Sequence, residues 1–110
     1  MKTPMMITFR GMAPSAWMEA DIRSRAAKLD TYCPRITKCH VAVDIPHRHH
    51  EEGNRISVRI DLTVPGEALA VTHNSRKDIR VVIGKAFEIA RRQLREYAGR
   101  RRAPRRLKVA

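Results

Sequence analysis

The stretch RISVRIDLTV, Arg55–Val64, decides the fold of this 110-residue chain. Apolar residues occupy every second position from Ile56 to Val64 and alternate with Arg, Ser, Asp and Thr. Such strict alternation predicts a strand with one buried face and one face in water. Pro65-Gly66 follows and is typical of a tight turn. The next apolar pair, Leu69 and Val71, is therefore predicted to form the returning strand of a hairpin.

Upstream of this hairpin, the same alternation predicts strands over Met5–Arg10 and Cys39–Ile45. Between them, Ser15 is a plausible N-cap for a helix that ends before Pro34. Apolar residues at helical spacing predict its buried stripe: Met18, Ile22, Ala26, Leu29 and Tyr32. Pro46–Asn54, PHRHHEEGN, is a polar loop between two strands.

A second helix is predicted to begin at Asp78, after a loop over His73–Lys77. Its expected buried stripe is Ile79, Ile83, Ala86, Phe87, Ala90, Leu94 and Tyr97. Gly99 and Pro104 predict the end of this helix. The remaining RRRAPRRLKVA is expected to be disordered without a partner.

The predicted order is β-α-β-β-β-α. A β-α-β step normally gives a parallel pair with a right-handed crossover, and the next three strands form an antiparallel meander. Because each strand has one apolar face, both helices should cover the same side of the sheet. The fold class is α+β: a two-layer sandwich with a four-stranded mixed sheet and two helices on one face. Residues 1–98 form the predicted domain, and 99–110 a basic tail.

The chain carries 23 Lys+Arg against 11 Asp+Glu, a formal net charge of +12. This surplus indicates a polyanionic partner, either nucleic acid or an anionic membrane surface. From Arg91 to Lys108 there are nine basic residues and one acidic residue, Glu96. No apolar run is long enough to span a bilayer, and residues 1–8 do not have the character of a signal peptide. We expect a cytoplasmic protein that binds nucleic acid and not a membrane.

Helical geometry places the cations of the last helix mainly along one exposed edge. Arg80, Arg91, Arg95, Arg102 and Lys77 share that edge, and Lys85 and Arg92 lie further round. Like charges stacked along a helix repel one another, and a row of bound phosphates would offset that repulsion. The planar guanidinium of arginine also makes bidentate hydrogen bonds to phosphate. The first helix carries three more candidate RNA-binding cations, Arg23, Arg25 and Lys28. Acidic residues on the same helix lower its net positive charge, so an ordinary solvent-exposed face is an equally good interpretation of this helix.

Other chemistry finds less support in the residues. Cys33 and Cys39 form no CxxC pair and indicate a reducing compartment, with Cys39 as a core residue. His47, His49 and His50 precede two glutamates, but no standard zinc spacing is met, so we expect no metal and no cofactor. Because phosphate-loop, GxSxG and HExxH patterns are absent, we expect no enzyme and no small-molecule substrate. Trp17 is expected to pack at the helix–sheet rim, or alternatively to stack on a base.

From about Met5 to Tyr97, the chain resembles the ribosome hibernation-promoting factor family, also called ribosome-associated inhibitors or sigma-54 modulation proteins. The resemblance rests on ITFRGM (7–12), AAKLDTY (26–32), VRIDLTVPG (58–66) and the Asp78–Leu94 helix that ends in ARRQL. The loop PHRHHEEGN is similar to a subset of the family in which this domain can be joined to a cold-shock domain. Order and spacing together, rather than any single motif, carry the resemblance.

This resemblance implies a fold related to double-stranded RNA-binding domains. It also implies binding to ribosomal RNA in the messenger and transfer RNA channel of the small ribosomal subunit, where the protein would block translation under stress. The family positions carried over are Arg23, Arg25, Lys28, Lys77, Arg91, Arg92 and Arg95. With the charge pattern, the full predicted RNA-binding set adds Arg80, Lys85, Arg100, Arg101 and Arg102.

Two features depart from the family pattern. Arg80 stands where many members carry a tyrosine. We also expect this chain to be a short member, without the C-terminal domain by which long members promote ribosome dimers, so dimer promotion and the oligomeric state stay open. Two alternative functions remain: a general module for structured RNA, and a metal-binding regulatory protein that uses the histidine loop.

Overall fold

The computed structural model describes residues 3–45 and 55–109, with side chains described as far as Arg100. The elements follow the predicted order β-α-β-β-β-α. Their bounds are β1 (Met5–Arg10), α1 (Ala16–Tyr32), β2 (Lys38–Asp44), β3 (Ile56–Val64), β4 (Glu67–Ser75) and α2 (Ile79–Val109).

The four strands form one mixed sheet in the order β1-β2-β3-β4. β1 pairs parallel with β2, and the pairs β2–β3 and β3–β4 are antiparallel. β1 and β2 are parallel because α1 returns the chain to the end of the sheet at which β1 began. At the hairpin between β3 and β4, Gly66 adopts a positive φ of 88°, which the predicted Pro-Gly turn requires.

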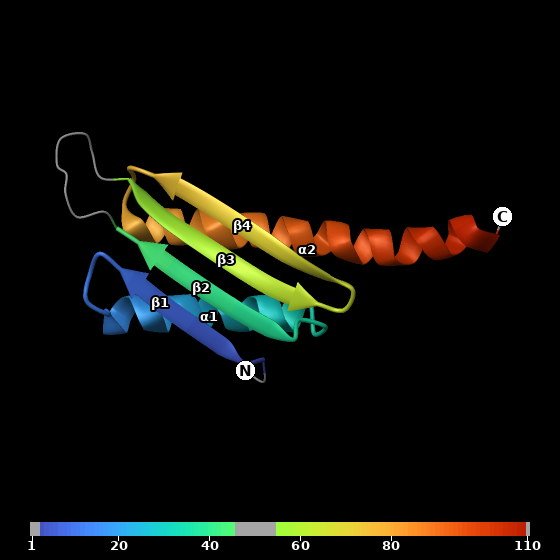
Figure 1. Cartoon of the computed structure of the whole chain (residues 1–110), viewed down its shortest axis with the longest axis horizontal. Coiled ribbons are helices and arrows are strands. Elements are labelled where there is room, and N and C mark those ends of the chain that lie inside the picture. The colour runs from blue at the N-terminus through green and yellow to red at the C-terminus, as the bar shows by residue number, and fades with distance from the viewer. Residues whose placement is uncertain (1–2, 46–54, 110) are drawn as a thin grey trace.

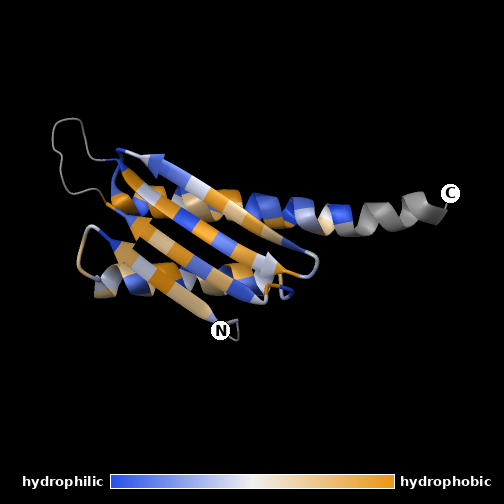
Figure 2. Cartoon of the chain, viewed as in Figure 1, coloured by the Kyte–Doolittle hydropathy of each residue, from blue (hydrophilic) through white to orange (hydrophobic). Residues whose placement is uncertain are grey.

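Both helices cover the same face of the sheet, α1 behind β1 and β2 and α2 behind β3 and β4 (Figure 1). Figure 2 shows hydrophobic and hydrophilic residues alternating along β3, the pattern that gives the sheet one face toward the helices and one toward water. Between the layers lie fully buried side chains from both helices and from β2 and β3, among them Ile22, Val41, Ile60, Ile83 and Leu94. The predicted α+β two-layer sandwich is confirmed.

The first helix begins where its cap was predicted. Ser15 has extended backbone angles, and its side-chain oxygen accepts a hydrogen bond from the Met18 backbone N–H. At the other end, the Cys33 N–H donates to the Leu29 carbonyl. One stripe residue was predicted wrongly, because Tyr32 is 40% exposed while Cys33 and Ile36 are buried. In α2, Val82 is fully buried although it lies outside the predicted buried stripe.

β4 is longer than predicted. His73, Asn74 and Ser75 continue the strand, where the sequence predicted a loop. They extend it because β3 offers them partners, with Ile56 opposite Ser75 and Val58 opposite His73. The ladder of a long neighbouring strand therefore overrides the weak strand preference of these polar residues.

α2 is also longer than predicted, because the chain remains helical through Gly99 and Pro104 to Val109. Glycine and proline raise the free energy of a helix without forbidding it, and Arg, Ala, Leu and Lys are strong helix formers. The segment also grows from turns that are already packed, so it needs no new nucleus. The predicted helix end at Gly99 is therefore wrong, whereas the disorder of the basic tail without a partner stays a prediction. No helix in the described part of the chain is long and apolar enough to cross a membrane.

Gly11 is a position that requires glycine. Its φ is +78°, and an added Cβ would lie 1.8 Å from the Ile45 carbonyl oxygen. We expect Gly11→Ala to lower the free energy of unfolding by about 2 kcal/mol or more. Urea denaturation measures this change. Gly99→Ala is the matched control, because nothing lies within 4 Å of the added Cβ. That control should leave stability unchanged or raise it, and an equal loss in both variants would contradict the steric account.

Burial beneath the sheet, with smaller contributions from Asp30 and Asp61, raises the pKa of the Cys39 thiol from 9.0 to about 11. The unfolded chain therefore ionises this thiol first as pH rises. We expect the free energy of unfolding to fall between pH 9 and 11, by on the order of 2 kcal/mol. Denaturation under reducing conditions across this range tests it. Cys39→Ala should remove that part of the pH dependence, and identical pH profiles would refute the assignment.

Candidate nucleic-acid interface

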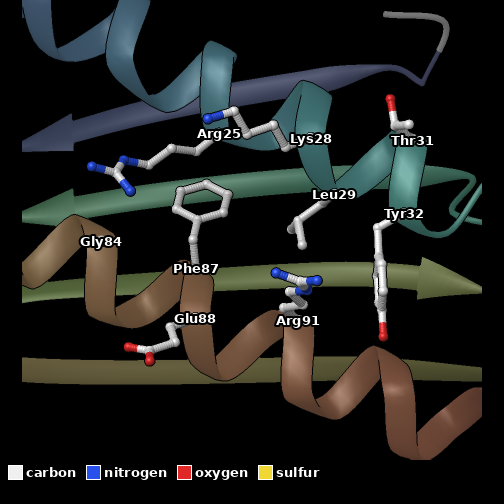
Figure 3. Close-up of a pocket in the computed structure, with 9 residues that line it drawn as sticks. All are labelled: Arg25, Lys28, Leu29, Thr31, Tyr32, Gly84, Phe87, Glu88 and Arg91. Atoms are coloured by element: carbon white, nitrogen blue, oxygen red, sulfur yellow. The ribbon is translucent and has the colours of Figure 1, made fainter.

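The two helices lie side by side and form the two sides of an open groove of about 580 Å³ on the outer surface of the helical layer. Figure 3 shows the groove and the side chains that both helices contribute to it. Its lining comprises Arg25, Lys28, Leu29, Thr31 and Tyr32 of α1, and Gly84, Phe87, Glu88 and Arg91 of α2.

The groove combines an apolar floor with cationic walls. Leu29 and Phe87, each 5% exposed, belong to the hydrophobic core and close the groove from below. Arg25, Lys28 and Arg91 line it from the two helices. The Arg25 guanidinium lies over α2 at position 84, where there is no side chain and an added Cβ would lie 3.3 Å from the Arg25 Nη1.

Two contacts between a guanidinium and an aromatic ring join the helices. The Arg91 Cζ lies 4.8 Å from the centroid of the Tyr32 ring. Nearer the start of both helices, the Arg80 Cζ lies 4.8 Å from the centroid of the Trp17 ring. Both aromatic side chains are largely exposed, Trp17 at 45% and Tyr32 at 40%. Neither pairing could be predicted from the sequence, because no spacing rule links residues on two different helices.

Carboxylates partly neutralise other cations of the predicted set. Arg23 and Arg25 each form an ion pair four residues back, with Glu19 and Asp21 at 3.2 Å. Lys85 pairs with Glu88 at 3.6 Å, and Arg100 pairs with Glu67 at 2.7 Å. Exposed pairs of this kind contribute at most about 1 kcal/mol each to stability. Within residues 3–45 and 55–100, no carboxylate lies within ion-pair distance of the cations that remain, which are Lys77 before α2 and, on the helices, Lys28, Arg80, Arg91, Arg92 and Arg95.

The structure gathers only part of the predicted set at the groove. Arg25, Lys28 and Arg91 line it, and Arg80 lies on the same α1-facing edge of α2. Arg23 lies on the other side of α1, where it lines a second hollow beside Thr3 and Met5 of the β1 edge.

The remaining members of the set lie elsewhere. Arg92, Arg95 and Lys85 are exposed on α2, and Arg100 is drawn toward β4 by its ion pair. Lys77 was placed wrongly on the helical edge, because α2 begins only at Ile79. The side chains of Arg101 and Arg102 lie outside the described part.

The histidine loop cannot be placed, since His47, His49 and His50 lie outside the described residues. Within residues 3–45 and 55–109, no three His, Cys, Asp or Glu side chains gather in a way that could hold a metal ion. The metal-binding alternative therefore stays a hypothesis that rests on the sequence of the loop alone.

The fold and the groove together define a small, basic α+β domain with cations gathered along two neighbouring helices. Within this class, the chain belongs to the family described as Sigma 54 modulation protein / S30EA ribosomal protein, whose profile matches residues 5–102. No curated protein sequence matches the chain significantly.

Two of the solved structures that share the fold illustrate the likeness. A ribosomal subunit interface protein from Coxiella burnetii superimposes with a TM-score of 0.74 at 13% identity, covering 88% of this chain and 99% of that one. The N-terminal domain of Thermus thermophilus Protein Y gives a TM-score of 0.62 at 15% identity, covering 86% of this chain and 98% of that one. At these identities the likeness establishes the architecture, and residue roles must be argued from this chain.

The Tyr32–Arg91 contact should stabilise the pairing of the two helices. A double-mutant cycle with Tyr32→Ala and Arg91→Ala, followed by urea denaturation, isolates its coupling energy. We expect about 0.5–1 kcal/mol, the usual size for a guanidinium over an exposed ring. A cycle with Tyr32→Ala and Arg92→Ala is the control and should give no coupling. Equal coupling in both cycles would mean that the ring contact is not the source.

Proposed function

We propose that this protein is a ribosome-associated translation inhibitor. It binds ribosomal RNA in the messenger and transfer RNA channel of the small ribosomal subunit in the cytoplasm, and it blocks translation under stress by occlusion, without catalysis. Membership of the S30EA ribosomal protein family supports this role. A protein of the same fold carries the name ribosomal subunit interface protein, which points to the same partner.

The observation that carries the proposal is the group of cations on the helical layer without a carboxylate partner among the described residues. Five side chains form this group, hereafter the open cations: Lys28, Arg80, Arg91, Arg92 and Arg95. A cation that has no carboxylate partner and lies beside other cations is stabilised most when a phosphate binds to it. Four of the five are arginines, whose fork suits phosphate oxygens.

The other predicted residues take secondary places in this proposal. Arg23, Arg25, Lys85 and Arg100 already pair with carboxylates, so RNA must displace or share those partners. Lys77, Arg101 and Arg102 add long-range attraction. Residues 1–98 would form the ribosome-binding domain, and the basic end of α2 would extend the contact. Recognition would rest on RNA shape and phosphate positions, with little reading of base sequence.

Reversing two of the open cations should weaken ribosome binding. We expect Arg91→Glu with Arg95→Glu to reduce affinity for small subunits at least about tenfold, because two phosphate contacts become repulsive. Sedimentation of the purified protein with small subunits measures this, with excess transfer RNA and duplex RNA as competitors. The unaltered protein should saturate near one copy per subunit in the presence of both competitors.

The matched control is Arg10→Glu with Lys38→Glu, which changes net charge equally on exposed positions of the strands. It should bind nearly as well as the unaltered protein, and log affinity against log salt should lose a slope of about 2 only in the helix variant. Equal loss in both variants, or displacement by either competitor, would leave a general binder of structured RNA.

A further inference from the structure

The groove between α1 and α2 has a composition that phosphate binding alone does not require. Cations on an exposed face are enough to hold a phosphate backbone. Here Arg25, Lys28 and Arg91 surround a floor made by Leu29 and Phe87. Apolar floors with a few polar groups around them are typical of sites for small organic groups, and such sites usually enclose about 300–1,000 Å³. The 580 Å³ of this groove falls in that range.

The Tyr32–Arg91 contact gives this groove a flat wall. Arg91 is held over the Tyr32 ring, 4.8 Å from its centroid, and both residues line the groove. In Figure 3 the Arg91 guanidinium lies between the Tyr32 ring and the middle of the groove, beneath Leu29. Guanidinium planes and aromatic rings are the two protein surfaces on which unpaired bases stack. Because the ring fixes the guanidinium, less side-chain entropy is lost when a base arrives.

Charge gives the groove a direction. The cations Arg25 and Lys28 come from α1, whereas α2 contributes Arg91 together with the one lining carboxylate among the described residues, Glu88. A carboxylate repels phosphate and accepts hydrogen bonds from the amino and imino groups of a base. Glu88 keeps acceptor capacity for this, because its contact with Lys85 is long, at 3.6 Å.

We propose that this groove is a nucleotide site: it holds one unpaired nucleotide, with the base on the Leu29–Phe87 floor against the Arg91–Tyr32 wall. The phosphate lies at Arg25 and Lys28, and the hydrogen-bonding edge of the base faces Glu88. The proposal deepens the RNA-binding function and rests on it for the expectation that the nucleotide belongs to an RNA strand. The same chemistry would also accept a free nucleotide, so the experiment must separate the two sources.

The test is a titration of the full chain, observed through backbone amide NMR resonances. Adenosine and guanosine 5′-monophosphates are the probes, and ribose 5-phosphate is the control that lacks the base. We expect both nucleotides to shift resonances of residues 28–32 and 84–91 and to bind at least about fivefold more tightly than ribose 5-phosphate, because base stacking adds to the phosphate contact. Equal affinities, or shifts confined to other parts of α2, would overturn the proposal.

Tyr32→Ala tests the wall directly. The side chain is 40% exposed, so its loss should leave the fold intact, which the NMR spectrum itself reports. The variant should lose most of the preference for nucleotide over ribose 5-phosphate. Trp17→Ala is the matched control, because it removes the other ring–guanidinium contact, which lies outside the groove lining. It should keep the preference, and the same loss in both variants would count against the site.

A single-stranded RNA hexamer, compared with the same hexamer carrying one abasic position, separates the two sources. An RNA nucleotide is supported if the intact hexamer binds more tightly than the mononucleotides and the abasic change weakens it. A free nucleotide is supported if the mononucleotides bind at least as tightly as the hexamer. Failure of the groove is distinct from failure of the ribosome proposal, because charge reversal at Arg91 and Arg95 could still abolish co-sedimentation while nucleotides do not bind.

Discussion

Each strand of the sheet has one apolar face, and both helices must share the single surface that these faces form. The shared surface holds the helices side by side, and the absence of a side chain at Gly84 lets Arg25 lie between them. The crossover through α1 and the meander before α2 also start both helices at the same end of the sheet (Figure 1). The groove and its cations therefore follow from the way the core is closed.

The helical layer stabilises several of its arginines without cancelling their charge. A carboxylate beside an arginine satisfies the guanidinium but removes its attraction for an anion at longer range. An aromatic ring contacts the guanidinium through its quadrupole and leaves the net charge intact. Arg80 and Arg91 have such ring partners, whereas Arg23, Arg25 and Arg100 have carboxylate partners. At the groove, where Arg25 is paired with Asp21, Arg91 therefore contributes a positive charge that its partner does not cancel.

The strands, the helix stripes and the single apolar face could be predicted because each depends on local periodicity. The exposed cations of α2 could be placed by the same geometry. The pairings of Tyr32 with Arg91 and Trp17 with Arg80 could not, since they depend on how far apart two helices settle. The length of β4 was missed because its last residues gain their partners from β3. The length of α2 was not predicted because glycine and proline were expected to end the helix, whereas they only reduce its stability.

Residues 101–109 of α2 project beyond the sheet, and Figure 1 shows no other helix or strand beside them. An isolated peptide of that length would be a poor helix in water, because its first turn must form without support. In this chain the packed turns before Gly99 supply that first turn, so the charged segment only has to propagate it. Repulsion among its arginines works against propagation, and Pro104 cannot donate the next backbone hydrogen bond. How far the segment stays helical therefore depends on propagation from the packed turns against repulsion among the arginines. Dissolved salt screens this repulsion and so favours a longer helix.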